Sequence, residues 1–301
     1  MALIPFDDRD GFIWLDGQMK PWREAQLHVL SHALHYASAV FEGERCYAGN
    51  IFRLRDHTNR LIESGRILGF ELGWTADQID AACDAVVRAN GLTEAYVRPI
   101  AWRGAEEMGV GAKATKIHLA IATWEWGAYF GVEQRMKGVR LDMAKWRRPA
   151  PDTAPTASKA AGLYMIGTMS KHAAMDAGFD DAFMLDHKGD LAEATGANAF
   201  FVMADGAIHT PTPTCFLDGI TRRTVMALAR KRQMQVVERV IGVEELARAS
   251  EVFLAGTAAE VTPVACIGEC HFTPGEITRT LMQDYMALTK MSPVAVMQRV
   301  G

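Results

Sequence analysis

Three segments of this 301-residue chain combine residue types that could do chemistry. The first, residues 157–162, places Lys159 among small residues where a strand-like segment meets a helical one, which leaves room beside its amine for a planar ring. A desolvated lysine amine is a good nucleophile and can form a Schiff base with a carbonyl compound. The same pattern is typical of a solvated lysine at a helix start, because most lysines are exposed.

The other two segments are candidate anion sites. In residues 217–223, Gly219 permits an unusual backbone turn and Thr221 can cap the following helix, so amide groups and a hydroxyl could bind an anion. Residues 256–260 place small side chains and one hydroxyl at a strand end, where the backbone can approach a ligand closely. Taken alone, these patterns also suit an ordinary capped helix and a tight turn. Together with Lys159 they fit a phosphorylated aldehyde cofactor.

The elements that must position these segments cluster by type, which favours an α+β fold over strict strand–helix alternation. In the first part of the chain, Asp16-Gly17 predicts a hairpin turn, and Thr75 to Gln78 forms a capping box that opens a helix ending near Asn90-Gly91. The predicted elements there are hairpins at 11–22 and 40–53, helices at 28–39 and 56–68, and strands at 95–102 and 117–123.

The pattern weakens after residue 127, which predicts a small N-terminal domain at 1–127, an interdomain loop at 128–138 and a larger C-terminal domain at 139–301. The elements expected beyond this loop are helices at 160–177, 221–233, 243–248 and 277–288 and strands at 182–185, 199–203, 207–209 and 251–254.

Composition excludes several classes of protein. Apolar residues make up 49% of the chain, charged residues 23%, and the net charge of −4 gives no reason to expect nucleic acid or an anionic membrane as partner. The sequence has no run of apolar residues long enough to span a membrane and no secretory signal at its start, so we expect a cytoplasmic protein.

Five cysteines in a chain of this length argue against a disulfide framework. Cys266, Cys270 and His271 are metal-ligand types at close spacing, but no second ligand cluster accompanies them. The sequence therefore predicts no metal site.

At Glu193-Ala-Thr-Gly-Ala-Asn198, downstream of Lys159, the chain resembles the fold-type IV pyridoxal-phosphate (PLP) transaminases, and within them the branched-chain amino-acid aminotransferases. The resemblance runs from His32-Ala-Leu-His-Tyr36 to Gly256-Thr-Ala-Ala-Glu260, with the motifs in the family's order. It implies a D-amino-acid-aminotransferase-like fold with a small N-terminal α/β domain and a larger C-terminal domain that has a β-barrel-like core.

The resemblance also implies a role for each cofactor-binding residue. Lys159 would carry PLP as a Schiff base, and Glu193 would keep the pyridine nitrogen protonated so that the ring acts as an electron sink. Tyr164 would hydrogen-bond the ring hydroxyl oxygen. The phosphate would be bound by Arg60, Ile220, Thr221 and Thr257.

The substrate residues implied by the resemblance are Tyr36, Phe41, Tyr96, Arg98, Val110, Trp126, Tyr129 and Ala258. Arg98 would accept the side-chain carboxylate of glutamate, while the apolar walls would accept leucine, isoleucine or valine. Each aromatic side chain is individually also typical of core packing.

The implied activity is transfer of the amino group of L-leucine, L-isoleucine or L-valine to 2-oxoglutarate, with the Lys159 amine as general base. Two alternatives share the scaffold: a D-amino-acid transaminase and an aminodeoxychorismate-lyase-like enzyme. A third is a non-catalytic dimeric protein. The family further implies a homodimer or larger assembly, in which residues near Tyr36 and Val110 reach the neighbour's site.

The chain departs from the family's usual residues at four positions. Ala37 stands where glycine is more usual, Asp218 where proline is common, and Ala197 where glutamate is frequent. Glu44 replaces an apolar residue, and the resemblance predicts that it lies near the pocket entrance.

Overall fold

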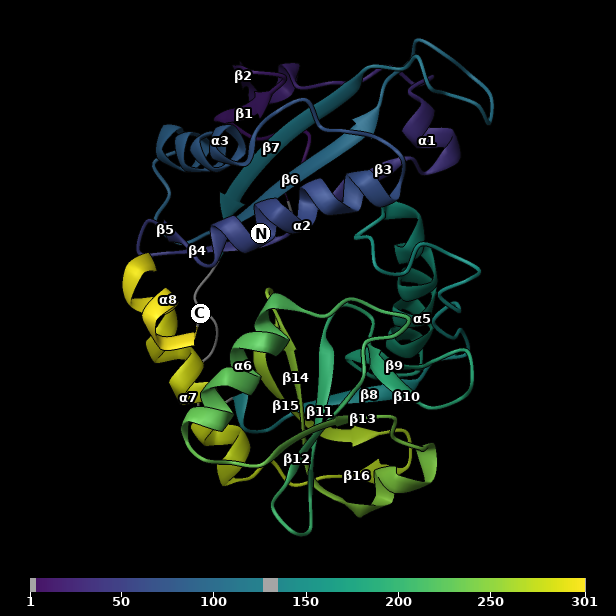
Figure 1. Cartoon of the computed structure of the whole chain (residues 1–301), viewed down its shortest axis with the longest axis vertical. Helices are drawn as coiled ribbons and strands as arrows, with labels where there is room; N and C mark the ends of the chain where they lie inside the picture. The colour runs from purple at the N-terminus through teal and green to yellow at the C-terminus, as the bar shows by residue number, and fades with distance from the viewer. Residues whose placement is uncertain (1–3, 127–134, 301) are drawn as a thin grey trace. The chain divides into compact units, whose positions relative to one another are not determined.

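The computed structural model describes residues 4–126 and 135–300 (Figure 1). Contacts divide the chain into two compact units: Met1–Ala128 with Ser158–Gly162, and Tyr129–Ala157 with Leu163–Gly301. The expected second domain, 139–301, includes Lys159, whereas the contacts group the short segment around Lys159 with the first unit. Much of the expected loop at 128–138 lies outside the described residues.

The first unit is built on a mixed-length antiparallel sheet with the order β2-β1-β7-β6-β4-β5, and β3 also pairs with β6. Its strands are β1 Phe12–Leu15, β2 Gln18–Pro21, β3 Ala39–Phe41, β4 Glu44–Tyr47, β5 Asn50–Ile51, β6 Ala95–Arg103 and β7 Ile117–Glu125. The predicted hairpin turn at Asp16-Gly17 is confirmed, with φ of 49° and 90° at its two central residues. Positive φ at both positions matches the twist of the flanking strands.

Helices α2 (Leu54–Ile67) and α3 (Ala76–Ala89) cover one face of this sheet (Figure 1). Their apolar faces pack on alternate residues of β6 and β7 in one core that includes Leu61, Ile79, Val97 and Leu119. The capping box is present as predicted, since Gln78 N–H donates to Thr75 Oγ1 at 3.3 Å and Thr75 N–H donates to Gln78 Oε1 at 2.8 Å. The helix expected at 28–39 is shorter, with α1 covering His32–Tyr36.

The second unit contains a closed barrel of six of its described strands. The sheet order β10-β9-β8-β15-β14-β11 closes on itself because β10 also pairs with β11 at Glu193 and Asn198. The strands of this unit are β8 Val139–Met143, β9 Asp181–Leu185, β10 Leu191–Ala194, β11 Asn198–Met203, β12 Ile208–Pro211, β13 Val236–Arg239, β14 Ala249–Gly256, β15 Glu260–Ile267 and β16 Cys270–His271. The interior is apolar and includes Leu141, Phe183, Phe201 and Val264, so the predicted α+β fold with a barrel-like core is confirmed.

Four α-helices of this unit are described: α5 Met165–Asp176, α6 Ile220–Lys231, α7 Glu276–Thr289 and α8 Pro293–Val300. The continuous helix expected at 160–177 is instead a 3-10 helix, Ala161–Tyr164, followed by α5, and the helix expected at 243–248 is also a 3-10 helix. Over the described residues, no helix combines the length and the hydropathy that crossing a membrane requires.

Candidate functional site

Lys159 lies in a loop that the first unit holds on two sides. Its backbone N–H donates to Ser64 Oγ on α2 at 3.0 Å, and its carbonyl accepts from Phe41 N–H at 3.2 Å. Ser158 Oγ donates to the Ser64 carbonyl at 3.0 Å, and Ala160 bridges to β3. The lysine backbone is therefore fixed, and its Nζ lies 4.9 Å from the centre of the Phe41 ring.

Arg98, on β6, lies between two aromatic rings. Its Cζ is 4.8 Å from the centre of the Phe41 ring and 5.2 Å from that of Tyr96, and its Nη2 donates to Tyr96 Oη at 3.2 Å. The Nε of Arg98 is buried and has no hydrogen-bond partner among the described residues. A buried donor without an acceptor is unfavourable, so this arginine is suited to an anionic ligand.

Tyr96 is held in an aromatic stack and against a glycine. Its ring centre lies 5.0 Å from that of Trp124 and 4.9 Å from that of Trp126. A Cβ at Gly43 would come within 1.9 Å of Tyr96 Oη, so a larger residue at position 43 would displace the hydroxyl. The structure thus brings Phe41, Tyr96, Arg98 and Lys159 together, as expected from the sequence.

Arg60, on α2, is paired with a carboxylate that the sequence analysis did not single out. Glu42 is fully buried and accepts from Arg60 Nε at 2.6 Å and from Arg60 Nη2 at 2.9 Å. It also lies 2.7 Å from Nδ1 of His57, one turn before Arg60. Burial acts to raise the pKa of Glu42, but the Arg60 charge and the hydrogen bonds from Arg60 and His57 hold it well below its usual value.

His57 is neutral in this cluster. Burial lowers the pKa of His57 and outweighs the opposing effect of the Glu42 carboxylate. Nδ1–H therefore donates to Glu42, which leaves the Glu42–Arg60 pair as the charged part of the cluster. The bidentate geometry fixes one edge of the Arg60 guanidinium.

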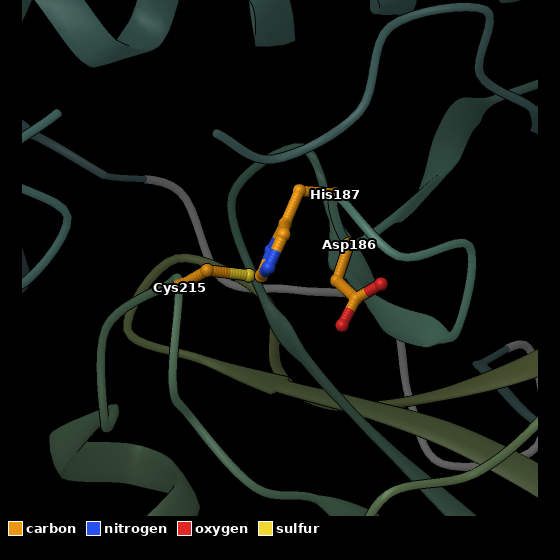
Figure 2. Close-up of side chains that lie close together, drawn as sticks. All are labelled: Asp186, His187 and Cys215. Atoms are coloured by element: carbon orange, nitrogen blue, oxygen red, sulfur yellow. The ribbon is translucent and has the colours of Figure 1, made fainter. Parts of the chain in front are cut away.

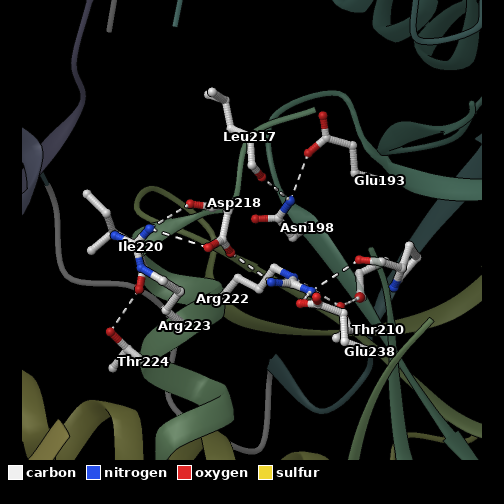
Figure 3. Close-up of polar contacts among 12 residues, drawn as sticks. Glu193, Asn198, Thr210, Leu217, Asp218, Ile220, Arg222, Arg223, Thr224 and Glu238 are labelled. Carbon is white, nitrogen blue, oxygen red and sulfur yellow. Dashed lines mark hydrogen bonds and ion pairs between the residues drawn. The ribbon is translucent and has the colours of Figure 1, made fainter. Parts of the chain in front are cut away.

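Glu193, on β10 in the second unit, is held by an arginine and by an amide, and Figure 3 shows the amide contact, from Asn198. Arg148 Nη2 lies 2.9 Å from Glu193 Oε1, and Asn198 Nδ2 donates to Glu193 Oε2 at 3.0 Å. Asn198 Nδ2 also donates to the Leu217 carbonyl at 3.0 Å. One side chain therefore connects Glu193 to the loop that leads into α6.

The N-terminus of α6 lies where the sequence predicts an anion site, around residue 219. Gly219 is the N-cap, and Ile220 and Thr221 are buried at the start of the helix. A Cβ at Gly219 would lie 2.2 Å from Asn198 Oδ1, so the close approach of these segments requires glycine. First-turn N–H groups lack acceptors within the helix and favour an anion.

Asp218, which stands in place of the family's proline, belongs to a polar network beside this helix start (Figure 3). Arg222 is 1% exposed and donates to Asp218 Oδ1 at 2.7 Å and to Glu238 Oε2 at 2.5 Å. Aspartate in place of proline at position 218 thus provides a carboxylate that pairs with the buried Arg222.

Thr257 and Ala258 lie in the turn between β14 and β15 and are half-buried. A Cβ at Gly256 would meet Ala197 Cβ at 3.0 Å and the Gly196 carbonyl at 3.2 Å, so this turn packs on the loop that follows Glu193. Within the second unit, the Glu193 strand, the start of α6 and the Thr257 turn are therefore neighbours.

Tyr36 and Val110 are exposed residues of the first unit, at 44% and 90%. They are connected through buried His32, whose ring stacks on Tyr36 at 4.5 Å and whose Nε2 lies 2.8 Å from the Gly109 carbonyl. The short helix and the loop near Val110 therefore form one exposed surface. Ala37 ends that helix with φ of 53°, which explains why glycine is the more usual residue there.

Glu44, which the resemblance predicts near a pocket entrance, is buried in the first unit. Glu44 is 1% exposed, and its oxygens have no hydrogen-bond partner within the described ranges. Along β4, alternate residues share a face, so Glu44 lies on the same side as Cys46, which is part of the apolar core.

The sequence-predicted residues thus fall into two sets. The set in the first unit is Tyr36, Phe41, Arg60, Tyr96, Arg98, Val110, Trp126 and Lys159, and the set in the second unit is Tyr164, Glu193, Ile220, Thr221, Thr257 and Ala258. Tyr164 is half-buried at the end of its 3-10 helix, and Tyr129 lies outside the described residues.

Four supporting residues were missed at the sequence level: Glu42, His57, Arg148 and Asn198. A signal existed for two of them, because Asn198 closes the Glu193 motif and His57 precedes Arg60 by one helical turn. Arg148 and Glu42 are recognised only through their tertiary contacts.

The family model described as Amino-transferase class IV matches residues 39–267. A branched-chain-amino-acid aminotransferase of Pseudomonas aeruginosa is 42% identical over 288 residues, covering 93% of this chain and 94% of the relative. The Escherichia coli enzyme of that name is 39% identical over 290 residues, covering 92% of each chain.

Solved structures agree with these sequence matches. The T.th. branched-chain amino acid aminotransferase with pyridoxamine 5'-phosphate superposes with a TM-score of 0.93 at 36% identity, covering 97% of this chain and 98% of that one. The branched-chain aminotransferase of Thermoproteus uzoniensis with norvaline gives 0.90 at 34% identity, covering 97% and 99%.

Proposed function

The chain belongs to the class IV aminotransferase family, and from that premise we propose that it is a PLP-dependent branched-chain amino-acid transaminase. It would transfer the amino group of L-leucine, L-isoleucine or L-valine to 2-oxoglutarate. The observation that carries this substrate choice is the position of Arg98 between the rings of Phe41 and Tyr96, with a buried Nε that lacks an acceptor among the described residues.

One pocket must accept both an apolar and a carboxylate side chain in this reaction. Arg98 can donate to the carboxylate of 2-oxoglutarate or glutamate, because its guanidinium carries a full charge and a free buried donor. The aromatic faces of Phe41, Tyr96 and Trp126 can pack on a branched aliphatic side chain. Tyr129 and Ala258 complete the proposed substrate contacts.

The residues present fit PLP. When bound, PLP supplies a conjugated ring that takes up electron density as the substrate Cα–H bond breaks. We assign attachment to Lys159 Nζ, whose amine then moves the proton from the substrate Cα. Glu193, oriented by Arg148 and Asn198, holds a proton at the pyridine nitrogen, and Tyr164 hydrogen-bonds the ring oxygen.

For the phosphate we assign Arg60, the α6 amides of Ile220 and Thr221, and Thr257. The helix N-terminus contributes donors and a favourable dipole, and Arg60 contributes a charge positioned by Glu42. A homodimer, with Tyr36 and Val110 of each copy at the other's site, and a cytoplasmic location are further parts of the proposal. The exposure of both residues supports their assignment to such a contact.

The first experiment is an absorbance spectrum of the purified protein with PLP. We expect a band at the violet edge that disappears in Lys159→Ala, because the band requires PLP attached to that amine. Lys171→Ala is the matched control. Lys171 is an exposed lysine of α5 that forms an ion pair with Asp181 at 3.6 Å and has no proposed role in PLP binding. A band that survives in Lys159→Ala would exclude attachment at that residue.

A substrate panel separates the activities that share this scaffold. With 2-oxoglutarate as acceptor, we expect turnover of L-leucine, L-isoleucine and L-valine and loss of 2-oxoglutarate use in Arg98→Met. Turnover of D-alanine alone would instead indicate a D-amino-acid transaminase. Conversion of aminodeoxychorismate alone would indicate the lyase.

A further inference from the structure

Three side chains of metal-ligand type meet in the second unit, apart from the residues assigned to PLP and substrate. Asp186 and His187 follow β9, and Cys215 lies in the loop before α6 (Figure 2). A carboxylate oxygen, an imidazole nitrogen and a sulfur, one from each residue, all lie within 4.8 Å of one another. Asp186 and Cys215 are buried and His187 is half-buried.

Asp186 is fixed by its own turn. Its Oδ1 accepts backbone N–H groups from Lys188 at 2.8 Å, Gly189 at 2.8 Å and Asp190 at 2.9 Å. These bonds account for an aspartate at this position of the turn. They do not account for the imidazole and the thiol that lie beside it. Oδ2 accepts no hydrogen bond from the part of the chain that is described, so it remains available as a ligand atom.

His187 supplies the observation that points to a ligand. Its Nδ1 is buried and has no hydrogen-bond partner within residues 4–126 and 135–300. A buried polar atom left unpaired is destabilising, and native proteins pair nearly all such atoms. A bound cation would satisfy this nitrogen.

We propose that Asp186, His187 and Cys215 form a binding site for one zinc-type divalent cation. Imidazole nitrogen, thiolate sulfur and carboxylate oxygen are the zinc ligands of proteins, and three protein ligands leave a fourth position for water. Mg²⁺ and Ca²⁺ prefer sites made of oxygen atoms alone, so the mixed set selects against them.

Binding requires a proton to leave and the site to contract. Burial raises the pKa of the Cys215 thiol to about 11, so the free residue is protonated. On binding, the S–H bond breaks, the proton passes to solvent and a sulfur–metal bond forms, with no change of oxidation state. Ligand bonds of about 2.0–2.3 Å then draw the three atoms closer together through side-chain rotation.

The site would connect two segments that carry proposed cofactor contacts. The turn with Asp186 and His187 joins β9 to β10, which bears Glu193, and the loop with Cys215 leads into α6. A cation bound only by the folded state would stabilise this unit by mass action. We therefore expect the midpoint of thermal unfolding to rise with Zn²⁺ concentration and to return after chelation.

The experiment is a titration of the PLP-loaded protein with CdCl₂, with Cd²⁺ as a spectroscopic substitute for Zn²⁺. We expect one Cd²⁺ per chain by equilibrium dialysis and an ultraviolet sulfur-to-metal charge-transfer band. Cys215→Ser should abolish the band. His187→Asn should weaken binding by at least about tenfold, since one of three ligands is lost. Excess Mg²⁺ should not compete.

The matched control is Cys270→Ser, which removes a thiol next to His271 on β16. These two residues are also of metal-ligand type and are adjacent in sequence. This variant should bind Cd²⁺ as the parent does. The proposal is overturned if the folded parent shows no band, if the band is lost in Cys270→Ser, or if it persists in Cys215→Ser. Should Cys215→Ser fail to fold, unchanged affinity in His187→Asn overturns it.

Discussion

Two glutamates that are buried against an arginine, Glu42 in the first unit and Glu193 in the second, belong to pairs that work in opposite senses. In the Glu42–Arg60 pair, the arginine is the proposed phosphate contact and the carboxylate supports it. In the Glu193–Arg148 pair, the carboxylate is the proposed contact to the pyridine nitrogen and the arginine supports it. In both pairs, the side chain proposed to contact the cofactor, Arg60 or Glu193, stays ionised and oriented because it pairs with a buried residue of opposite charge.

The two pairs also differ in how they are anchored. Both side chains that donate to Glu42, those of His57 and Arg60, come from the single helix α2, and Glu42 itself is fully buried. Glu193 is held by Arg148 from a loop and by Asn198 from β11, and Asn198 in turn binds the Leu217 carbonyl. We infer that the first pair contributes mainly to stability and the second mainly to chemistry.

The largest effect that tests this contrast is expected for Glu42→Gln. The substitution leaves the Arg60 charge uncompensated beside a buried amide, and breaking such a pair costs about 3–5 kcal/mol. We expect that loss in the free energy of unfolding, measured by denaturant titration, together with weaker PLP binding. With saturating PLP, turnover should recover to a large extent.

Glu63→Gln is the matched control for this loss. Glu63 lies on the same helix, but its side chain is 61% exposed and lies 3.8 Å from Arg66. Surface substitutions of this kind usually change stability by less than about 0.5 kcal/mol. Equal stability of the Glu42→Gln and Glu63→Gln variants would contradict a supporting role for Glu42.

The second effect is expected for Glu193→Gln. The glutamine keeps the shape and the contact with Asn198 but removes the charge, so the proton at the pyridine nitrogen is no longer held. We expect kcat to fall by about 10²–10³, the range for loss of one preorganised electrostatic group, while PLP remains bound. The unfolding free energy should fall less than in Glu42→Gln. A kcat within a few-fold of the parent would remove the assigned role.

The sequence predicted the proposed contact residues better than their supports. Lys159, Glu193 and Arg98 carry family motifs, and the structure places Arg98 and Lys159 beside the same Phe41 ring. Glu42 lacks such a signal, because its partners are defined by tertiary packing. A sequence motif identifies the residue that contacts the ligand. The residues that orient it come from distant parts of the chain and are recognised only in the folded structure.

The same limit applies to the fold. Local rules located the Asp16-Gly17 hairpin and the Thr75 capping box, since both depend on neighbours in sequence. Strand β15 was missed because Pro263 interrupts its pattern, and a proline usually argues against a central strand. In the barrel, Pro263 is opposite Phe253 on β14, while the pairing with β8 begins one residue later, at Val264.

Glu44, a further buried glutamate of the first unit, gives the test with the smallest expected effect. Glu44 lies two residues from Glu42 but has no arginine partner in contact with it among the described residues. Burial raises the pKa of Glu44 well above its usual value, Glu42, Asp80 and Asp84 add to this, and Arg60 opposes it. Burial therefore favours the protonated form of Glu44, whereas the partners of Glu42 favour its ionised form.

The two carboxyl groups should act on stability with opposite signs as pH changes. In the unfolded chain both titrate near 4.5. Glu42 contributes stability above that value and loses it as pH falls toward its lowered pKa. Glu44 contributes below that value, and its contribution is lost as pH rises toward its raised pKa, because the unfolded chain ionises first.

Glu44→Leu should therefore stabilise the protein at alkaline pH. It replaces an unsatisfied buried carboxyl group with an apolar side chain of similar size, and the expected gain is about 1–3 kcal/mol, shrinking as the pH is lowered toward 4.5. Unfolding free energies measured across this pH range test the prediction, and kcat should not change. If the gain were the same at both ends of the range, Glu44 would be ionised in the folded protein, and the contrast with Glu42 would fail.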